Sequence, residues 1–163
     1  MKKFFILIIA FVLIMSFTAC GNMAQPSESE SISTDKKDTD ETEDITAMKM
    51  SVTIGEQSFT VVLEDNAATR ELVKMMEEGP ISIDMDDYSG FEKVGSLGKS
   101  LPTDNQQMTT QAGDIVLYSG NQIVMFYGSN SWNYTKIGKI DDLSGWEDAL
   151  GTDSVTAVFS IVK

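Results

Sequence analysis

Residues 113–128 read GDIVLYSGNQIVMFYG, and this stretch decides the fold class. Two apolar runs, 115–118 and 123–127, stand on either side of the turn-forming residues 119–121. Short runs rich in β-branched and aromatic residues around a glycine-bearing turn predict a β-hairpin. We therefore expect a mainly β domain.

Further short strands are predicted on both sides of this hairpin. Upstream, residues 50–54 and 59–63 alternate apolar and polar side chains around a glycine-bearing turn, and residues 81–85 look strand-like. Downstream, residues 136–140 and 155–162 have strand composition. Several short strands with closely spaced turns favour a closed or nearly closed β-barrel.

One or two helices are expected between the strands. Residues 67–78 carry an apolar stripe, Asn66 is a suitable N-cap, and Gly79 followed by proline marks the end of the helix. A second, short helical segment is predicted within residues 143–150. The glycine-bearing stretch 90–102 is interpreted as a loop.

The first 47 residues are predicted to lie outside the domain. Residues 1–19 combine two lysines, the apolar run 4–15 and small residues before Cys20, the pattern of a cleaved signal peptide. The apolar run is shorter than the roughly 20 residues of a membrane-spanning helix. Residues 20–47 are rich in Ser, Thr and acids, which is typical of a disordered linker. One ordinary domain remains, residues 48–163.

Cys20 is the only cysteine of the chain. Residues 18–22 (TACGN) resemble the lipobox of bacterial lipoproteins, although Phe17 departs from the usual Leu or Val. The resemblance implies cleavage before Cys20 and lipidation of its thiol, with acyl chains such as palmitate. It implies an extracytoplasmic protein of the cell envelope, anchored to a membrane. The alternative is an ordinary secretory signal with a chance cysteine.

Charge and composition exclude several classes of function. Residues 48–163 contain 8 basic and 17 acidic side chains, and this negative balance argues against nucleic-acid binding, which depends on neutralising phosphates. The chain has no histidine, and a lipidated Cys20 leaves no thiol, so His-based triads, Cys-His pairs and histidine metal motifs are absent. No catalytic residue, metal site or cofactor is predicted.

Four acidic residues come closest to a metal-binding motif: Asp84, Asp86, Asp87 and Glu92. They do not fit the calcium-binding loop, because its sixth and twelfth positions are Ser89 and Gly95 instead of Gly and Glu. We interpret the segment as a solvated acidic turn.

A series of spaced motifs resembles the bacterial cyclophilin-like domain family. They are residues 91–95 (FEKVG), 101–102 (LP), 113–118 (GDIVLY), 126–128 (FYG) and 134–140 (YTKIGKI). The likeness extends over roughly residues 50–162. It implies a closed antiparallel β-barrel of about eight strands with helices covering the open ends, and it implies the fold much more than a function.

Prolyl isomerisation is the enzymatic activity that this resemblance suggests. Classical cyclophilins place an arginine on the strand after the first helix, where it donates to the proline nitrogen. Residues 81–86 contain no arginine, and the only arginine, Arg70, lies in the predicted helix. Lys93 offers a cation, but an ammonium is not a planar five-donor group. A non-standard prolyl isomerase or folding helper is therefore the alternative function.

The preferred function is binding of a small molecule or an extended peptide. The candidate ligand-contacting residues are Glu92, Lys93, Tyr118, Phe126, Trp132 and Tyr134. Trp132, in the polar segment 128–133, is the aromatic residue least easily explained as core, and the alternative is that it folds back over the barrel end. The pair 92–93 marks either a pocket rim or a solvated ion pair. A purely structural envelope component is a third hypothesis.

Overall fold

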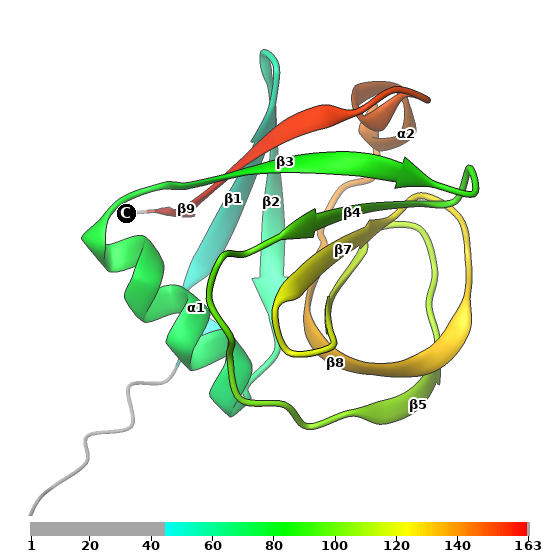
Figure 1. Ribbon diagram of the computed structural model, residues 1–163. Coiled ribbons are helices and arrows are strands. Elements are labelled where there is room, and N and C mark those ends of the chain that lie inside the picture. Colours follow the sequence, from blue (N-terminus) through cyan, green and yellow to red (C-terminus); the bar gives the residue numbers. More distant parts are fainter. Residues whose placement is uncertain (1–44, 163) are drawn as a thin grey trace, which may run out of the picture. The chain divides into compact units, whose positions relative to one another are not determined.

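Nine antiparallel strands form one sheet that curls until its ends meet (Figure 1). The computed structural model describes residues 45–162. The strands are β1 (Lys49–Ile54), β2 (Gln57–Leu63), β3 (Ile81–Tyr88), β4 (Glu92–Ser96), β5 (Gln106–Thr109), β6 (Asp114–Tyr118), β7 (Gln122–Phe126), β8 (Ser131–Ile140) and β9 (Val155–Val162). The helices are α1 (Ala67–Glu78) and α2 (Trp146–Leu150), and a 3₁₀ turn, η1, covers Ile45–Ala47.

The strand order is β2-β1-β9-β3-β4-β7-β6-β8-β5, and β2 also pairs with β8. This last pairing joins Val61 to Ile140 and closes eight strands into a barrel, with β5 attached to β8 alone. The prediction of a mainly β, closed barrel of about eight antiparallel strands with two helices is confirmed.

The predicted signal peptide, the lipidation site Cys20 and the linker up to residue 44 lie outside the described residues. At its other end the predicted linker extends too far, because Ile45 is buried and η1 contacts β2. The part from Asp40 to Lys163 forms a compact unit by itself. Within residues 45–162, no helix is long and apolar enough to cross a membrane.

Two glycines allow neighbouring strands to approach closely. A Cβ at residue 138 on β8 would lie 2.5 Å from the carbonyl oxygen of Val62 on β2. A Cβ at residue 95 on β4 would lie 2.5 Å from a methyl carbon of Ile83 and 2.7 Å from the carbonyl oxygen of Asp84, both on β3. Glycine is therefore required where the barrel closes and where β4 crosses over β3.

Helix α1 forms as predicted and packs on β8 and β9. The Asn66 side chain accepts a hydrogen bond from the Thr69 backbone N–H at 3.0 Å, and its amide donates to the Lys136 carbonyl at 2.7 Å. The cap thus fixes both the start of the helix and its position against β8. The buried face carries Ala68, Thr69, Leu72, Val73 and Met76.

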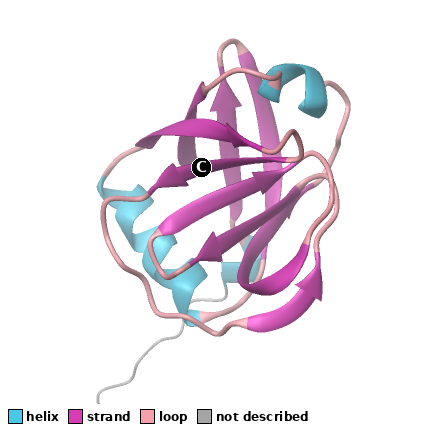
Figure 2. Ribbon diagram, turned by 45° about the vertical axis from the view of Figure 1, so that its right-hand side comes forward, coloured by secondary structure: helices cyan, strands magenta, loops and turns pink. Residues whose placement is uncertain are grey.

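Helix α2 lies far from α1 in both views (Figures 1 and 2). Its Trp146 is almost completely buried, packs edge-on against Phe59 with 5.0 Å between ring centroids, and donates its indole N–H to the Phe126 carbonyl at 2.8 Å. A buried indole needs such a partner, and this bond ties α2 to the end of β7.

Three parts of the sequence-based assignment are wrong. The predicted loop 90–102 contains β4. The predicted acidic turn lies largely on β3. There Asp84 accepts a hydrogen bond from Thr156 on β9, and Asp86 accepts one from Ser154, the residue before β9. Strand β8 also begins five residues earlier than expected, so Trp132 lies on a strand instead of in a loop.

Candidate functional site

The β4, β7, β6 and β8 strands carry a second, smaller apolar cluster on the side that faces away from the main core. Its buried members are Val116, Val124, Phe126 and Tyr134, and Phe91, Val94 and Met108 pack against it. Their neighbours in the chain, such as Leu117 and Met125, belong to the main core. This part of the barrel wall is therefore apolar on both faces, which is unusual for an antiparallel sheet with one solvated side.

A cleft of about 500 Å³ lies over this outer cluster. We call it the aromatic cleft, and it is lined by Tyr88, Glu92, Val94, Tyr118, Gln122, Val124, Asn130, Trp132 and Tyr134. Its volume is within the range of roughly 300–1,000 Å³ that is typical of small-molecule sites.

Three of the lining aromatic residues are strongly exposed. The exposed fractions are 58% for Tyr88, 37% for Tyr118 and 55% for Trp132. They come from β3, β6 and β8, yet all three line the same cleft. Among the described residues, these are the only large exposed aromatic side chains, and such a gathering is typical of a binding surface.

Glu92 provides the charge of the cleft. It is the first residue of β4, opposite Tyr88 of β3 and Phe126 of β7, and only 6% of it is exposed. Its Oε2 atom is buried and has no hydrogen-bond partner within the protein. Burial raises the pKa of the Glu92 carboxyl group to about 7, because a charged group is disfavoured where water is excluded.

Tyr134 forms the most enclosed wall of the cleft. Its ring packs edge-on against Phe126 at 5.7 Å and against Tyr118 at 6.0 Å between centroids. Its hydroxyl oxygen accepts a hydrogen bond of 3.0 Å from the Asn130 amide, whose own oxygen accepts the Ser131 N–H. Burial, and next the charge of Glu92, raises the pKa of Tyr134. The ring is thus held in place from several sides.

The structure brings together four of the six residues predicted to contact a ligand: Glu92, Tyr118, Trp132 and Tyr134. Phe126 lies in the apolar layer beneath them and is fully buried. The interpretation of residues 92–93 as a solvated ion pair is wrong, because both side chains are buried and each points to a different side of β4.

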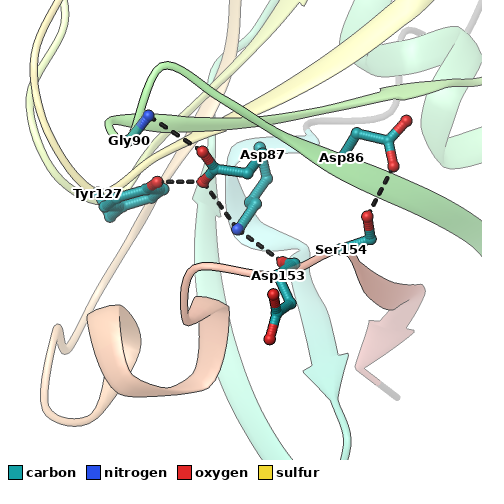
Figure 3. Close-up of polar contacts among 7 residues, drawn as sticks. Asp86, Asp87, Gly90, Tyr127, Asp153 and Ser154 are labelled. Atoms are coloured by element: carbon teal, nitrogen blue, oxygen red, sulfur yellow. Dashed lines mark hydrogen bonds and ion pairs between the residues drawn. The ribbon is translucent and has the colours of Figure 1, made fainter.

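Lys93 belongs to a polar cluster away from the cleft. Its Nζ lies 2.9 Å from Asp87 Oδ1 and donates to the Asp153 carbonyl at 2.8 Å, and its side chain is fully buried. Asp87 also accepts hydrogen bonds from the Tyr127 hydroxyl and from the Gly90 N–H, so its carboxylate lies at the centre of the cluster (Figure 3).

The pKa directions in this cluster follow from its contacts. The hydrogen bond from Tyr127, and next the one from Lys93, lowers the pKa of Asp87. Burial, and next the hydrogen bond to Asp87, raises the pKa of Tyr127 to about 12. Each member of the cluster already has a partner in the protein, which is the arrangement of a structural cluster.

Sequence reasoning missed five lining residues: Tyr88, Val94, Gln122, Val124 and Asn130. The valines look like ordinary core residues. Tyr88 was missed because the prediction ended its strand at residue 85, although the alternating side chains continue to Tyr88. Asn130 donates a hydrogen bond to the Tyr134 hydroxyl oxygen, and no sequence pattern predicts this contact.

A second hollow, of about 370 Å³, lies between β2 and residues 141–144. It is lined mainly by polar side chains, and its Asp142 already accepts hydrogen bonds from the Ser144 N–H and hydroxyl. Among the described residues, no group of three or more potential metal ligands is present. The aromatic cleft is therefore the stronger candidate site.

A sequence pattern of the cyclophilin-like family matches residues 52–160. The chain belongs to the cyclophilin-like family. The solution structure of a hypothetical protein from Archaeoglobus fulgidus is similar, with a TM-score of 0.52 and 15% sequence identity over 71% of this chain and 95% of that one. At this identity the likeness shows the fold alone. A search of curated proteins finds no match.

This cyclophilin-like barrel differs from the classical arrangement in the chemistry of its surface. The strand that follows α1 is β3, and it contains no arginine. The only arginine, Arg70, lies on α1 and forms an ion pair with Asp65. The lining of the aromatic cleft includes neither Lys nor Arg.

Proposed function

We propose that this protein is a lipid-anchored, extracytoplasmic binding module whose aromatic cleft holds a ligand. The observation that carries the proposal is the gathering of Tyr88, Tyr118 and Trp132, exposed and from three strands, over one cleft. Rigid aromatic side chains present a large contact area at little cost in conformational entropy. Tyr88 and Tyr118 also pack against Phe91 and Tyr134, but a large part of each of the three side chains stays open to solvent.

The chemistry of the lining supports binding over catalysis. The cleft combines an apolar floor with a few polar groups, namely the Glu92 carboxyl and the side-chain amides of Gln122 and Asn130. This composition is typical of sites that orient a ligand. The ligand is a small molecule or an extended peptide.

Ligand binding is tested with a soluble form, residues 40–163, which retains the compact unit. Amide and indole NMR signals are followed while a fragment set and a panel of extended peptides are added. We expect concentration-dependent shifts confined to the cleft, led by the indole N–H of Trp132. Trp146, which is buried at the start of α2 and does not line the cleft, serves as the internal control. Shifts that cluster elsewhere, or none, would count against the proposal.

The lipid anchor is tested in cells with an alkyne-labelled palmitate. We expect the label to be incorporated into the mature protein and to be lost in Cys20→Ala, with the variant released from the membrane fraction. Labelling that persists in Cys20→Ala, or a wild-type protein found free of the membrane, would contradict lipid anchoring at this residue.

A non-standard prolyl isomerase remains the alternative, and nothing in the cleft favours it. The buried Lys93 is bonded to Asp87 and the Asp153 carbonyl, so it offers no cation to a proline nitrogen in the cleft. Exchange NMR on X-Pro peptides tests the alternative directly. Acceleration of cis–trans exchange that is lost in Trp132→Ala would establish an isomerase whose site is the aromatic cleft and differs from that of classical cyclophilins.

A further inference from the structure

The carboxyl group of Glu92 differs from the other acidic side chains of its neighbourhood. Asp84 and Asp86 accept hydrogen bonds from Thr156 and Ser154, and Asp87 is bonded to Lys93 and Tyr127. Glu92 is more deeply buried than these, and its Oε2 atom is left without a partner while it lines the cleft. An unsatisfied buried acceptor is costly, so a ligand that donates to it gains from satisfying it.

The walls around Glu92 favour a positive charge on that donor. Tyr88, Tyr118, Trp132 and Tyr134 line the same cleft. The face of an aromatic ring carries negative charge density and attracts an organic cation, most strongly for tryptophan. A carboxylate among four aromatic side chains is the chemistry that recognises a protonated amine.

Within residues 45–162, no basic side chain supplies the missing cation. The basic residue nearest to Glu92 in the sequence, Lys93, is held on the other side of β4, and the cleft lining contains no basic residue. Residues 48–163 carry a net charge of −9, so the surrounding field attracts cations and repels anions.

We infer that the aromatic cleft binds a small organic amine in its protonated form, with the ammonium donating to Glu92 Oε2 and lying against the rings of the cleft. The inference rests on the proposed binding function and specifies its ligand class. At pH 8, above the Glu92 pKa of about 7, repulsion from the ionised carboxylate disfavours a carboxylate ligand. A neutral ligand would leave the Glu92 charge uncompensated.

The test compares 2-phenylethylammonium with 2-phenylethanol, which have nearly the same shape and both donate a hydrogen bond but differ in charge. Each is titrated into residues 40–163 at pH 8, with the Trp132 indole NMR signal and tryptophan fluorescence as readouts. Glu92→Gln removes the charge with little change in shape. The matched control is Glu77→Gln, the same substitution at an exposed position on α1.

We expect the amine to bind the wild type and Glu77→Gln about tenfold more tightly than the alcohol, which corresponds to about 1.4 kcal/mol. In Glu92→Gln the preference for the amine is expected to fall well below tenfold, and what remains reflects the aromatic rings and the negative field. Circular dichroism confirms that each variant is folded.

Equal affinity of the two compounds for the wild type would overturn the amine inference and leave the binding function standing. A preference for the amine that is undiminished in Glu92→Gln would overturn the role of Glu92. If neither compound moves the Trp132 signal, the amine inference also fails. The fragment and peptide titration then decides separately whether the cleft binds anything.

Discussion

Glu92 and Lys93 are neighbours in the sequence, yet their side chains enter different surroundings on opposite sides of β4. Lys93 is bonded to Asp87 and the Asp153 carbonyl, whereas Glu92 lies in the aromatic cleft with an unpartnered oxygen. A buried charge is tolerated where its partners are in place, and one without them is available to a ligand. The two residues are therefore expected to respond differently to substitution.

Asp87→Asn is expected to destabilise the barrel strongly. The variant leaves the ammonium of Lys93 buried without its countercharge, and an uncompensated buried charge costs about 3 kcal/mol. Asp84→Asn, the same change at an exposed position of β3, is expected to have a far smaller effect. Urea unfolding measures both. Equal effects of the two substitutions would mean that the Lys93–Asp87 pair adds nothing to stability.

Glu92→Gln is expected to stabilise the protein in a pH-dependent manner. Folding raises the pKa of Glu92 from an ordinary 4.5 to about 7, so the folded state holds this proton more tightly than the unfolded state. The contribution of Glu92 is thus most favourable below pH 4.5 and is lost as the pH rises to about 7. This shift in the pKa of Glu92 corresponds to about 3 kcal/mol in the free energy of unfolding.

The measurement is urea unfolding of the wild type and Glu92→Gln at pH 4 and pH 8. The gain in unfolding free energy from the substitution should be larger at pH 8, by about 3 kcal/mol. Glu77→Gln, the same substitution at an exposed position of α1, is measured alongside as the control. A Glu92→Gln effect that does not change with pH would show that the carboxyl is not desolvated.

The affinity of the cleft for the amine is expected to increase with pH. A bound ammonium favours the charged form of Glu92, so its affinity should rise as the pH increases from about 6 to about 8 and then level off. Tyr88, Tyr118 and Tyr134 face the same cleft, and no basic side chain does. Titration calorimetry at several pH values measures this. An unchanged affinity across pH 6–8 would contradict ion pairing with Glu92.

Trp132→Phe is expected to remove most of the quenching of tryptophan fluorescence by acrylamide. The chain has two tryptophans, and Trp132 is 55% exposed whereas Trp146 is 1% exposed. The emission that remains should lie at shorter wavelengths, because Trp146 is shielded from water. Trp146→Phe should instead lower the melting temperature, because it removes the bond to Phe126. Quenching that is unchanged in Trp132→Phe would contradict the exposure of the cleft.

Gly138→Ala is expected to destabilise the protein by about 1–3 kcal/mol, the usual cost of overpacking. The added methyl would lie 2.5 Å from the Val62 carbonyl oxygen and 2.8 Å from a methyl carbon of Val61, where β2 and β8 close the barrel. Asn133→Ala, at an exposed position of the same strand, is expected to change the stability by less than about 0.5 kcal/mol. Differential scanning calorimetry measures the melting temperatures of both variants. Equal melting temperatures would contradict the close approach of β2 and β8 at Gly138.

The parts of the fold that the sequence predicts correctly are those with local signals. Helix α1 has its cap, its apolar stripe and its terminating Gly79 within a single segment, and the hairpin of β6 and β7 has apolar strands around a tight turn. Strands β4 and β5 lack such signals. Strand β4 begins with two charged residues that are buried only because of tertiary packing. Strand β5 is a polar strand that pairs with β8 alone.

The aromatic half of the cleft could be predicted because tyrosine and tryptophan in polar surroundings are conspicuous in a sequence. The separation of Glu92 from Lys93 could not, since it depends on which face of β4 meets the core. The contact of β4 with β3 also depends on Gly95, where a side chain would clash with Ile83 and the Asp84 carbonyl oxygen. The pKa of a carboxyl group likewise depends on neighbours that are distant in the chain.

Strand β9 is the last of the nine strands in chain order, but it lies inside the sheet between β1 and β3 (Figure 1). Strand β1 at the beginning of the domain therefore lacks one of its two neighbours until residues 155–162 have been made. Such long-range pairing is slow to form and leaves strand edges exposed in the meantime. The barrel cannot be assembled piece by piece as the chain emerges. A truncation that removes β9 would therefore take away the shared neighbour of β1 and β3 and leave the barrel open.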